Sequence, residues 1–462
     1  MNLQDTIVAP ATGNIISALG IVRISGDKAI EIACNIFSPN NNRKLSDILK
    51  ANKLYYGSIK EDNRIIDEVV LSVFVAPNSF TGEDVVEISH HGSPYIQQEM
   101  IRLIVSKGAR LADKGEFSMR SFLNGKMNLS QTEAIADLIQ SNNSTSHLLA
   151  MKQLRGNYNE ELKTLRQRFL KIASLLELEI DFSAEQEVFV DRNELREELE
   201  KTSKSLEELT NSFKQGNSFK NGLPVAIVGK PNSGKSTLMN AILNDERSIV
   251  SSIEGTTRDT IEEVININGI QVRFIDTAGI RNSDNEIEKE GIRRSLLAIE
   301  KAQVVLYLVD SSTENIDSIQ QQLQEINQEV YSKEKEIILV ANKSDISTFS
   351  QQDTETLSQL NAVFICAKER KGLDKLLERI TQNMNIEDLN SKVFVCNERH
   401  YNALMNALID VNLALVSLES GADADIISFN IRRATENIGS ITGEICNDDI
   451  LSNIFSKFCI GK

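Results

Sequence analysis

The residues best suited to chemistry lie in the string GKPNSGKS, from Gly229 to Ser236, which fits the pattern G-x-x-x-x-G-K-[ST]. The apolar run PVAIV precedes this string and the helix-like run TLMNAIL follows it, which is the context that a phosphate-binding loop requires. Backbone N–H groups of such a loop approach phosphate oxygens, Lys235 supplies a charge for the β and γ phosphates, and the Ser236 hydroxyl can hold Mg²⁺. The string therefore predicts a nucleoside triphosphate site.

Two further motifs follow predicted strands and point to a guanine nucleotide. DTAG contains Asp276, a carboxylate that can organise Mg²⁺, and Gly279, whose N–H can contact a γ-phosphate. NKSD, which begins at Asn342, ends in Asp345, whose two oxygens can accept hydrogen bonds from the adjacent N1–H and amino donors of guanine. Adenine lacks that pair of donors, so the sequence predicts GTP in preference to ATP.

These three motifs, in this order, resemble the translation-factor-related branch of P-loop GTPases. On that resemblance, GTTRD (residues 255–259) falls at the first switch, with Thr257 as a second hydroxyl for Mg²⁺. CAK (residues 366–368) falls at the last base-contacting loop.

The spacing of residues does not fix the group that activates water. Ile280 follows DTAG, where many such GTPases carry a glutamine, and its side chain cannot hydrogen-bond to water. Asn232 either holds a monovalent cation against the phosphates or shapes the loop, and chemistry alone favours neither role. Four acids downstream of DTAG are candidates to orient the water: Asp284, Glu286, Glu288 and Glu290.

Alternating strands and helices from Leu223 to about Asn383 predict the parallel α/β sheet that would position these motifs. Its strand candidates are PVAIVG, VRFID, VVLYLVD, EIILVAN and VFICA. Asn268 and Gly269 stand between two alternating apolar runs, which predicts a hairpin with a type I′ turn.

Other segments have different patterns. Residues from Thr6 to about Gly125 mix strand-length runs such as LGIVRIS and VVLSVFV with helical stretches, which predicts an α+β domain. Helical periodicity dominates from about Met127 to Lys220 and again after Asn385, which predicts a helical bundle.

Composition restricts the class of protein. The chain has 462 residues, 41% hydrophobic and 25% charged, and no apolar run approaches bilayer length, so no membrane association is expected. The N-terminus has no basic residue before Arg23, which argues against a targeting peptide and favours a cytoplasmic protein. Five widely spaced cysteines and four histidines predict neither a disulfide framework nor a zinc site.

Charge bears on possible partners. The net charge of −16 argues against nonspecific coating of nucleic acid. The stretch from Arg102 to Lys126 is locally basic, and a solvated face is favoured there over a substrate patch. The terminal CIGK has the form of a prenylation box, but lysine is not a usual last residue of that box, so lipidation is not expected.

Strings along the whole chain stand in the order of one family. They are DTIVA, RISG, NSFTGEDVVE, GEFSMRSFLNGKMNLSQTEAIADLI, GKPNSGKSTLMNAIL, GTTRD, DTAGIR, NKSD, ITGEI and the terminal FCIGK. On these strings the chain resembles, over its full length, the MnmE (TrmE) family of tRNA-modification GTPases.

The resemblance implies a multidomain α/β fold with a Ras-like P-loop G domain inserted into a helical domain. It also implies an N-terminal α+β domain that binds a tetrahydrofolate and mediates homodimerisation. The expected domains are 1–125 (N-terminal), 126–221 (first helical part), 222–383 (G domain) and 384–462 (second helical part with the FCIGK tail).

The family also implies particular site residues. Those expected to contact GTP are Asn232, Ser233, Gly234, Lys235, Ser236, Thr237, Ser251, Ser252, Ile253, Glu254, Gly255, Thr256, Thr257, Asp276, Thr277, Ala278, Gly279, Asn342, Lys343, Asp345, Cys366, Ala367 and Lys368. Mg²⁺ ligands would be Ser236 and Thr257, and K⁺ ligands Asn232, Ser251, Ile253 and Thr256.

Two catalytic residues and a folate site follow from the same resemblance. Glu288 resembles the family's water-orienting acid, and Cys459 is the family's terminal cysteine, tied to the modification step. The residues on the folate contacts are Arg23, Glu87, Lys126 and Lys462. The folate would be 5-formyl- or methylene-tetrahydrofolate, whose carboxylates suit cations.

The expected function is GTP hydrolysis coupled to modification of the tRNA wobble uridine at C5, by addition of an aminomethyl or carboxymethylaminomethyl group. The expected partner is MnmG, which would supply FAD, in a heterotetramer or larger complex. The alternative is a ribosome-assembly GTPase of the Era or Der kind. Era-like proteins have an RNA-binding C-terminal module, and Der-like proteins have two tandem G domains. This chain is expected instead to have one G domain flanked by helical segments.

Overall fold

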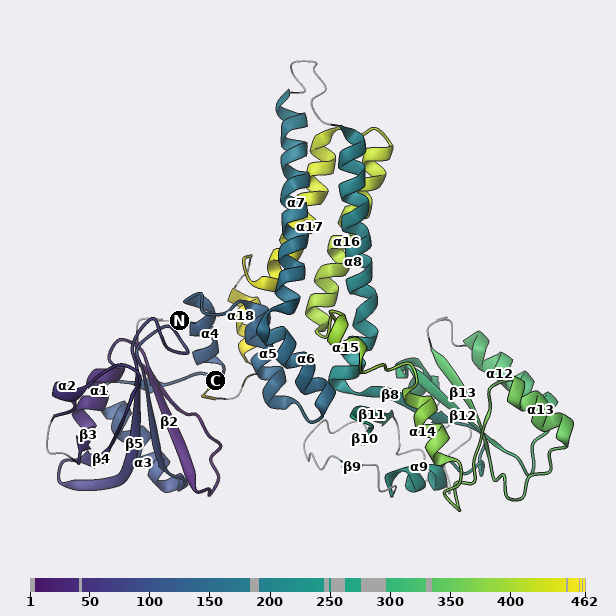
Figure 1. Ribbon diagram of the computed structural model, residues 1–462, viewed down its shortest axis with the longest axis horizontal. Helices are drawn as coiled ribbons and strands as arrows, with labels where there is room; N and C mark the ends of the chain where they lie inside the picture. The colour runs from purple at the N-terminus through teal and green to yellow at the C-terminus, as the bar shows by residue number, and fades with distance from the viewer. Residues whose placement is uncertain are drawn as a thin grey trace. The chain divides into compact units, whose positions relative to one another are not determined.

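The computed structural model describes residues 5–40, 44–182, 191–244, 249–250, 262–275, 296–329, 335–445, 448–456, 458 and 460–461. The chain forms two compact units (Figure 1). Unit 1 comprises Met1–Ala136, Gln153–Phe169 and Ile431–Lys462, and unit 2 comprises Asp137–Lys152 and Leu170–Asn430. The predicted fold class is confirmed, with an N-terminal α+β region, long helices and a P-loop type sheet, whereas the four domain boundaries stay a prediction.

Unit 1 contains a seven-stranded sheet in the order β3-β4-β5-β6-β2-β1-β7. Its strands are β1 (Ile7–Pro10), β2 (Leu19–Ser25), β3 (Phe37–Pro39), β4 (Lys53–Glu61), β5 (Arg64–Phe74), β6 (Val85–His91) and β7 (Arg110–Leu111). Neighbouring strands are antiparallel except β1 and β7, which are parallel. The predicted strand LGIVRIS is β2, and VVLSVFV lies largely in β5.

One face of this sheet is covered by helices α1 (Ala29–Ile36) and α3 (Pro94–Ser106). Val22 and Ile24 of β2, and Val86 and Ile88 of β6, are fully buried in that core, two residues apart along each strand as strand geometry requires. Alternate side chains lie on the other face, where Leu54 and Tyr56 of β4 are 70% and 54% exposed. That second face is called the open face below.

The rest of unit 1 is helical. Its further elements include α2 (Leu45–Ile48), α4 (Glu116–Leu123) and α18 (Asp448–Phe455), and α5 (Leu129–Gln140) begins in it. Phe455 and Phe458, near the C-terminus, pack with Met119 and Leu129 in a small apolar cluster. The residues near the C-terminus therefore pack against α4 and the start of α5 within unit 1.

Unit 2 contains a second seven-stranded sheet, in the order β14-β13-β12-β8-β11-β10-β9. Its strands are β8 (Leu223–Val228), β9 (Ile249–Val250), β10 (Glu263–Ile267), β11 (Ile270–Ile275), β12 (Val304–Asp310), β13 (Glu336–Asn342) and β14 (Val363–Phe364). The strands from β14 to β11 are parallel, and β10 and β9 continue antiparallel. The five predicted strands and the hairpin at Asn268 and Gly269, both at positive φ, are confirmed.

Helices surround this sheet and extend from it as a bundle (Figure 1). They are α6 (Ser144–Arg155), α7 (Asn157–Phe182), α8 (Arg192–Asn221), α9 (Lys235–Leu243), α12 (Ile316–Glu329), α13 (Gln351–Gln359), α14 (Leu373–Thr381), α15 (Asp388–Ser391), α16 (Glu398–Glu419) and α17 (Ala424–Thr442). The end of α6, α7 as far as Phe169 and α17 from Ile431 onward belong to unit 1. Phe219 of α8 and Leu149 of α6 belong to the same core cluster as Val225 of β8 and Phe274 of β11. The sheet and the base of the bundle thus share one core.

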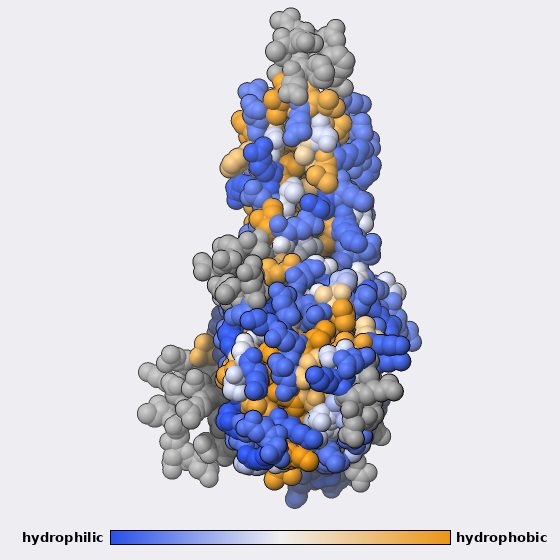
Figure 2. All heavy atoms as spheres, turned by 90° about the vertical axis from the view of Figure 1, so that its left-hand side faces the viewer, coloured by the Kyte–Doolittle hydropathy of each residue, from blue (hydrophilic) through white to orange (hydrophobic). Residues whose placement is uncertain are grey.

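Helix α16 is the one described helix that is long and apolar enough, by length and composition, to cross a membrane. Its apolar residues recur every three or four positions, and Leu404, Leu408 and Val411 are buried where α16 packs along α8. Core helices of helical bundles have the same composition. Figure 2 shows hydrophobic residues among hydrophilic ones on one side of the long helices.

Candidate functional site

The predicted phosphate-binding loop connects β8 to α9 at the carboxyl edge of the parallel sheet of unit 2. Gly229 and Gly234 have φ values of +154° and +98°. A Cβ added at Gly229 would lie 2.2 Å from the Leu308 carbonyl oxygen, and one at Gly234 would lie 2.3 Å from Asn342 Nδ2. The two glycines of the motif are therefore required by the close approach of neighbouring strands.

Lys235 is the first residue of α9 and turns back over the loop. Its Nζ donates to the carbonyl oxygens of Gly229 and Lys230, at 2.8 Å each. Burial lowers the pKa of Lys235. An anion placed against this ammonium group would favour its charged form.

Other residues of the loop differ in exposure. Ser233 is buried, and its Oγ has no hydrogen-bond partner among the described residues. Asn232 is exposed and has a φ of +64°, whereas Ser236 is half-buried in the first turn of α9 and Thr237 is exposed. Within three residues of Lys235, the loop therefore carries the buried hydroxyl of Ser233 and the exposed side-chain amide of Asn232.

Asn342, at the end of β13, links this loop to the predicted base-contacting segment. Its Nδ2 donates to the Ser233 carbonyl oxygen at 2.9 Å, and its Oδ1 accepts from the Ala367 N–H at 3.1 Å. The side chain is buried. One amide therefore fixes the spacing between the two loops.

Asp345 is exposed, and one of its oxygens is held by a thiol. Cys366 Sγ donates to Asp345 Oδ1 at 3.1 Å. That hydrogen bond is the main cause that lowers the pKa of Asp345, with help from the charges of Lys368 and Lys371. Burial and the Asp345 carboxylate raise the pKa of the Cys366 thiol. Asp345 therefore stays ionised as an acceptor, while Cys366 stays protonated as a donor.

Sequence reasoning missed Asp310, the last residue of β12. Its Oδ2 lies 2.6 Å from Nζ of Lys343, in the NKSD motif. An acid at the carboxyl end of a parallel strand, next to the strand that carries the phosphate loop, is the signal that could have found it.

Several predicted residues lie outside the described part of the chain. They are Ser251, Ser252, Ile253, Glu254, Gly255, Thr256, Thr257, Asp276, Thr277, Ala278, Gly279, Glu288, Cys459 and Lys462, together with Asp284, Glu286 and Glu290. Of the predicted metal ligands, Ser236 and Asn232 are described. Among the described residues, no group of three or more His, Cys, Asp or Glu side chains could hold a metal ion.

The predicted folate residues Arg23 and Glu87 meet on the open face of the unit 1 sheet. They are registered partners on β2 and β6, and Arg23 Nη2 lies 2.8 Å from Glu87 Oε1. The guanidinium carbon of Arg23 lies 5.3 Å and 5.6 Å from the ring centroids of Phe80 and Phe117, within cation–π range. The sequence did not single out these two rings.

The C-terminal tail reaches the same place. Arg23 Nη1 donates to the Gly461 carbonyl oxygen at 3.4 Å, and Ile460 forms an isolated antiparallel bridge with Lys114. Lys126 lies on the neighbouring loop, where its Nζ donates to the Pro77 carbonyl oxygen at 2.9 Å. The structure thus brings Arg23, Glu87 and the tail together, and Lys126, which follows α4, contacts the β5–β6 loop that carries Phe80.

The three arginines of the stretch from Arg102 to Lys126 are paired with acids, and the predicted solvated face is wrong for Arg120, which lies inside the domain. Arg102 pairs with Glu61 at 2.7 Å, and Arg110 pairs with Glu116 at 2.6 Å. Arg120 is buried, with Nη2 2.9 Å from Glu116 Oε1. These arginines therefore hold the domain together and are not free for phosphate groups.

Glu116 is the buried centre of that ion network. Burial acts to raise the pKa of its carboxyl, but hydrogen bonds from Arg110, the Asp113 N–H and Arg120 outweigh burial, so the pKa of Glu116 is lowered. Asp5 completes the network, 2.9 Å from Arg120 and 2.6 Å from Arg110. The network joins the start of the chain to α4.

Comparison with known proteins identifies the family. The model of the GTP-binding protein TrmE N-terminus matches residues 6–126, and that of the MnmE helical domain matches residues 129–459. A protein of Christiangramia forsetii named tRNA modification GTPase MnmE is 44% identical over 477 residues, covering 100% of both chains. Proteins of the same name from Flavobacterium johnsoniae (45% over 472 residues, 99% of both chains) and Bacteroides thetaiotaomicron (43% over 471 residues, 99% of this chain and 100% of that one) are also similar. With full-length identity at this level and two family models that together cover nearly the whole chain, the protein belongs to the MnmE (TrmE) family.

Proposed function

We propose that this protein is a GTP hydrolase that takes part in tRNA modification, at C5 of the wobble uridine. The observation that carries the proposal is the full-length identity to relatives named tRNA modification GTPase MnmE. The arrangement of Lys235, Asn342 and Asp345 at one edge of a parallel sheet supports the GTPase part. The same full-length identity supports this function over a ribosome-assembly GTPase.

The residues of the phosphate loop fit the two proposed metal ions. Ser236, at the start of α9, would hold Mg²⁺ through its hydroxyl, and the exposed Asn232 amide oxygen would hold K⁺. Bound cations would offset the negative charge that develops on the phosphates. Glu288 is proposed to orient the attacking water.

The N-terminal site fits a folate. The Glu87 carboxylate can accept hydrogen bonds from the donor edge of a pterin, and Arg23 and Lys126 can pair with the glutamate carboxylates. The rings of Phe80 and Phe117 flank Arg23 and keep its guanidinium in place. This site is proposed to bring the one-carbon unit of 5-formyl- or methylene-tetrahydrofolate near Cys459 of the tail.

Two assemblies belong to the proposal. The open face exposes Leu19 (66%), Leu54 (70%) and Tyr56 (54%), a set of apolar side chains that suits pairing with a second copy of the chain. MnmG is the proposed second partner. It would bring the flavin and, since this chain has a net charge of −16, most of the tRNA-binding surface.

Nucleoside mass analysis of tRNA tests the proposal. Total tRNA would be isolated from cells that lack their own family member, with and without this chain and its cognate MnmG. The expected result is that C5-modified wobble uridine returns with the chain and stays absent with Lys235→Ala, Glu288→Ala or Cys459→Ser. Unmodified uridine, despite soluble chain that hydrolyses GTP in potassium, would refute the tRNA assignment.

A further inference from the structure

We propose that Asp310 and Glu314, two acids at the carboxyl end of β12, are positioning residues for the guanine nucleotide. Asp310 would hold the base-reading loop, and Glu314 would hold the phosphate loop, although neither belongs to a nucleotide-binding motif. The inference rests on the proposed GTPase function and adds two residues to its site.

Asp310 holds the base-reading loop through Lys343. The carboxylate is 9% exposed, and its Oδ2 lies 2.6 Å from Lys343 Nζ. Its Oδ1 accepts from the Ser312 N–H at 2.9 Å. Burial acts to raise the pKa of Asp310, but the hydrogen bonds from Lys343 and Ser312 outweigh it and lower the pKa. The carboxylate is therefore charged at neutral pH and anchored on both oxygens.

The conformation of Lys343 explains why this loop needs an anchor. Lys343 has a φ of +61°, which side chains with a Cβ rarely adopt. It stands between Asn342, which bridges to the phosphate loop, and Asp345, the proposed base reader. An ion pair that fixes the Lys343 side chain also stabilises the unusual backbone that aims its two neighbours.

Glu314 holds the phosphate loop through Lys230. Its side chain is 6% exposed, and its Oε2 lies 2.9 Å from Nζ of Lys230, the second residue of the GKPNSGKS loop. Lys230 Nζ also donates to Ser318 Oγ at 3.1 Å. The other oxygen, Oε1, accepts from the Asp310 N–H at 2.9 Å. The backbone N–H of Asp310 thus links the Glu314 carboxylate to the residue that carries the other carboxylate.

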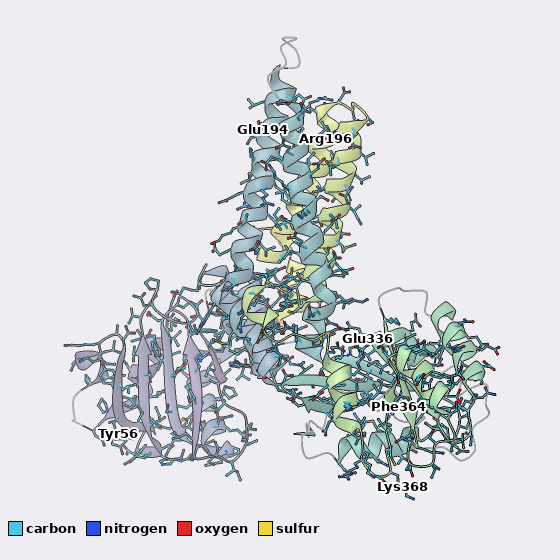
Figure 3. The ribbon with its side chains drawn as sticks, turned by 45° about the vertical axis from the view of Figure 1, so that its right-hand side comes forward. Tyr56, Glu194, Arg196, Glu336, Phe364 and Lys368 are labelled. Atoms are coloured by element: carbon cyan, nitrogen blue, oxygen red, sulfur yellow. The ribbon has the colours of Figure 1, made fainter. Side chains whose placement is uncertain are left out.

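The location of these two ion pairs in the sheet allows a role in positioning the nucleotide to be separated from a role in overall stability. Removing one partner of a buried ion pair lowers stability wherever the pair lies, because the other charge stays buried, so a loss of stability alone does not reveal a positioning role. Both pairs lie at the sheet edge that carries Asn342, whose carbonyl oxygen accepts from the Ser311 N–H at 3.0 Å. Glu336, in contrast, begins β13 and pairs with Arg379 at 3.0 Å. Figure 3 shows Glu336 and Lys368 at opposite ends of this domain, which makes Glu336 a matched control.

The test compares Asp310→Asn, Glu314→Gln and Glu336→Gln in the full-length chain. The measurements are thermal unfolding and affinity for GDP, IDP and ADP, since diphosphate binding does not depend on hydrolysis. All three variants should lose similar thermal stability. Glu336→Gln should bind GDP like the unmodified chain, whereas the other two should bind it about five- to tenfold more weakly.

The two acids should differ in base selectivity. Hypoxanthine lacks the amino group that Asp345 is proposed to read, so the ratio of GDP to IDP affinity reports on that carboxylate. Asp310→Asn should lower this ratio because it releases the base-reading loop. Glu314→Gln should weaken GDP and IDP equally because it releases only the phosphate loop.

Variants on the more exposed partners keep the test decisive if an acid variant does not fold. Lys230→Met removes the Glu314 pair from a side chain that is 43% exposed and should reproduce the Glu314→Gln pattern. Lys343→Met removes the Asp310 pair from a side chain that is 33% exposed. Because Lys343 is itself a proposed GTP contact, only its ratio of GDP to IDP affinity is compared with that of Asp310→Asn. GDP affinity equal to that of Glu336→Gln in Asp310→Asn, Glu314→Gln and Lys230→Met would overturn this inference and leave the proposed function standing. Failure of the unmodified chain to bind GDP or GTP would overturn the proposed function and this inference with it.

Discussion

At the scale of single residues, the site depends on donors and acceptors that are held before any ligand arrives. Asp345 accepts from a thiol, which is a weaker donor than the hydroxyl of serine. Glu116 and Arg120 form an ion pair with both side chains fully buried, and loss of either partner would remove one of the few charges that compensate the other. We therefore expect a small effect on GDP affinity from a substitution at Cys366 and a large effect on stability from one at Glu116.

We expect Cys366→Ala to weaken GDP binding about threefold, because Asp345 loses a hydrogen bond worth about 0.5–1.5 kcal/mol. Cys366→Ser should bind GDP at least as tightly as the unmodified chain, since the hydroxyl is the stronger donor. Titration of a fluorescent GDP analogue measures both. Cys396→Ala, at a buried cysteine in the helical segment, is the control and should leave affinity unchanged. Unaltered affinity in Cys366→Ala would disprove the role of the thiol.

We expect Glu116→Gln to destabilise the protein by about 3–5 kcal/mol at pH 7, because Arg110 and Arg120 lose their shared partner. The folded-state pKa of Glu116 is lowered, so its contribution is present above the unfolded pKa of about 4.3 and is lost as pH falls through the folded value. Urea unfolding at pH 7, 5 and 4 should show the difference between the two proteins shrinking in acid. A difference that does not change with pH would contradict this account.

At the scale of elements, the β10–β11 hairpin connects the nucleotide-binding sheet to α6. Thr145 Oγ1 lies within hydrogen-bond distance of the Gly269 carbonyl oxygen, at 3.3 Å, and of the Phe219 carbonyl oxygen, at 3.2 Å. Asn143 Nδ2 donates to Gln271 Oε1 at 3.0 Å. The hairpin turn is therefore fixed by the start of a bundle helix as well as by its own type I′ geometry.

We expect Gly269→Ala to cost more stability than Gly421→Ala. Both glycines have positive φ, +87° and +74°, which costs alanine about 1–2 kcal/mol. A Cβ at Gly269 would also lie 2.8 Å from Ser144 Oγ, whereas one at Gly421 would meet nothing within 4 Å. Urea unfolding followed by circular dichroism gives the two losses. Adding Ser144→Ala should recover part of the Gly269→Ala loss, and equal losses at the two glycines would refute the docking.

At the scale of the whole molecule, the chain ends in the domain where it began. Ile460 bridges to Lys114, and Arg23 donates to the Gly461 carbonyl oxygen across 438 positions of sequence. Gly461 has a φ of +94°, and a Cβ there would lie 2.0 Å from the Pro10 carbonyl oxygen. The tail thus docks through a residue that has no side chain.

We expect Gly461→Ala to undock the tail and abolish tRNA modification, while GTP hydrolysis stays within about twofold because the G domain is untouched. Gly108→Ala is the matched control, since Gly108 has a φ of +105° and nothing within 4 Å of an added Cβ. Nucleoside mass analysis and phosphate release measure the two activities. Full modification activity in Gly461→Ala would show that the docked tail is not needed.

The sequence by itself determined the features that depend on near neighbours. The phosphate loop, the NKSD segment, the five parallel strands and the turn at Asn268 and Gly269 each follow from spacing over a few residues, because turn chemistry and strand alternation are local. Motifs spread along the chain also predicted the family. The roles of individual site residues, and the domain boundaries, stay predictions.

Only the tertiary structure decided which distant residues meet. Arg110 and Arg120 read as surface charge in sequence, yet they are paired with Asp5 and Glu116 inside the domain. Asp310 became part of the site because parallel strands bring their carboxyl ends to one edge. Contacts of this kind depend on strand order and helix packing, which fix the distance between residues far apart in the chain, and no local pattern encodes that distance.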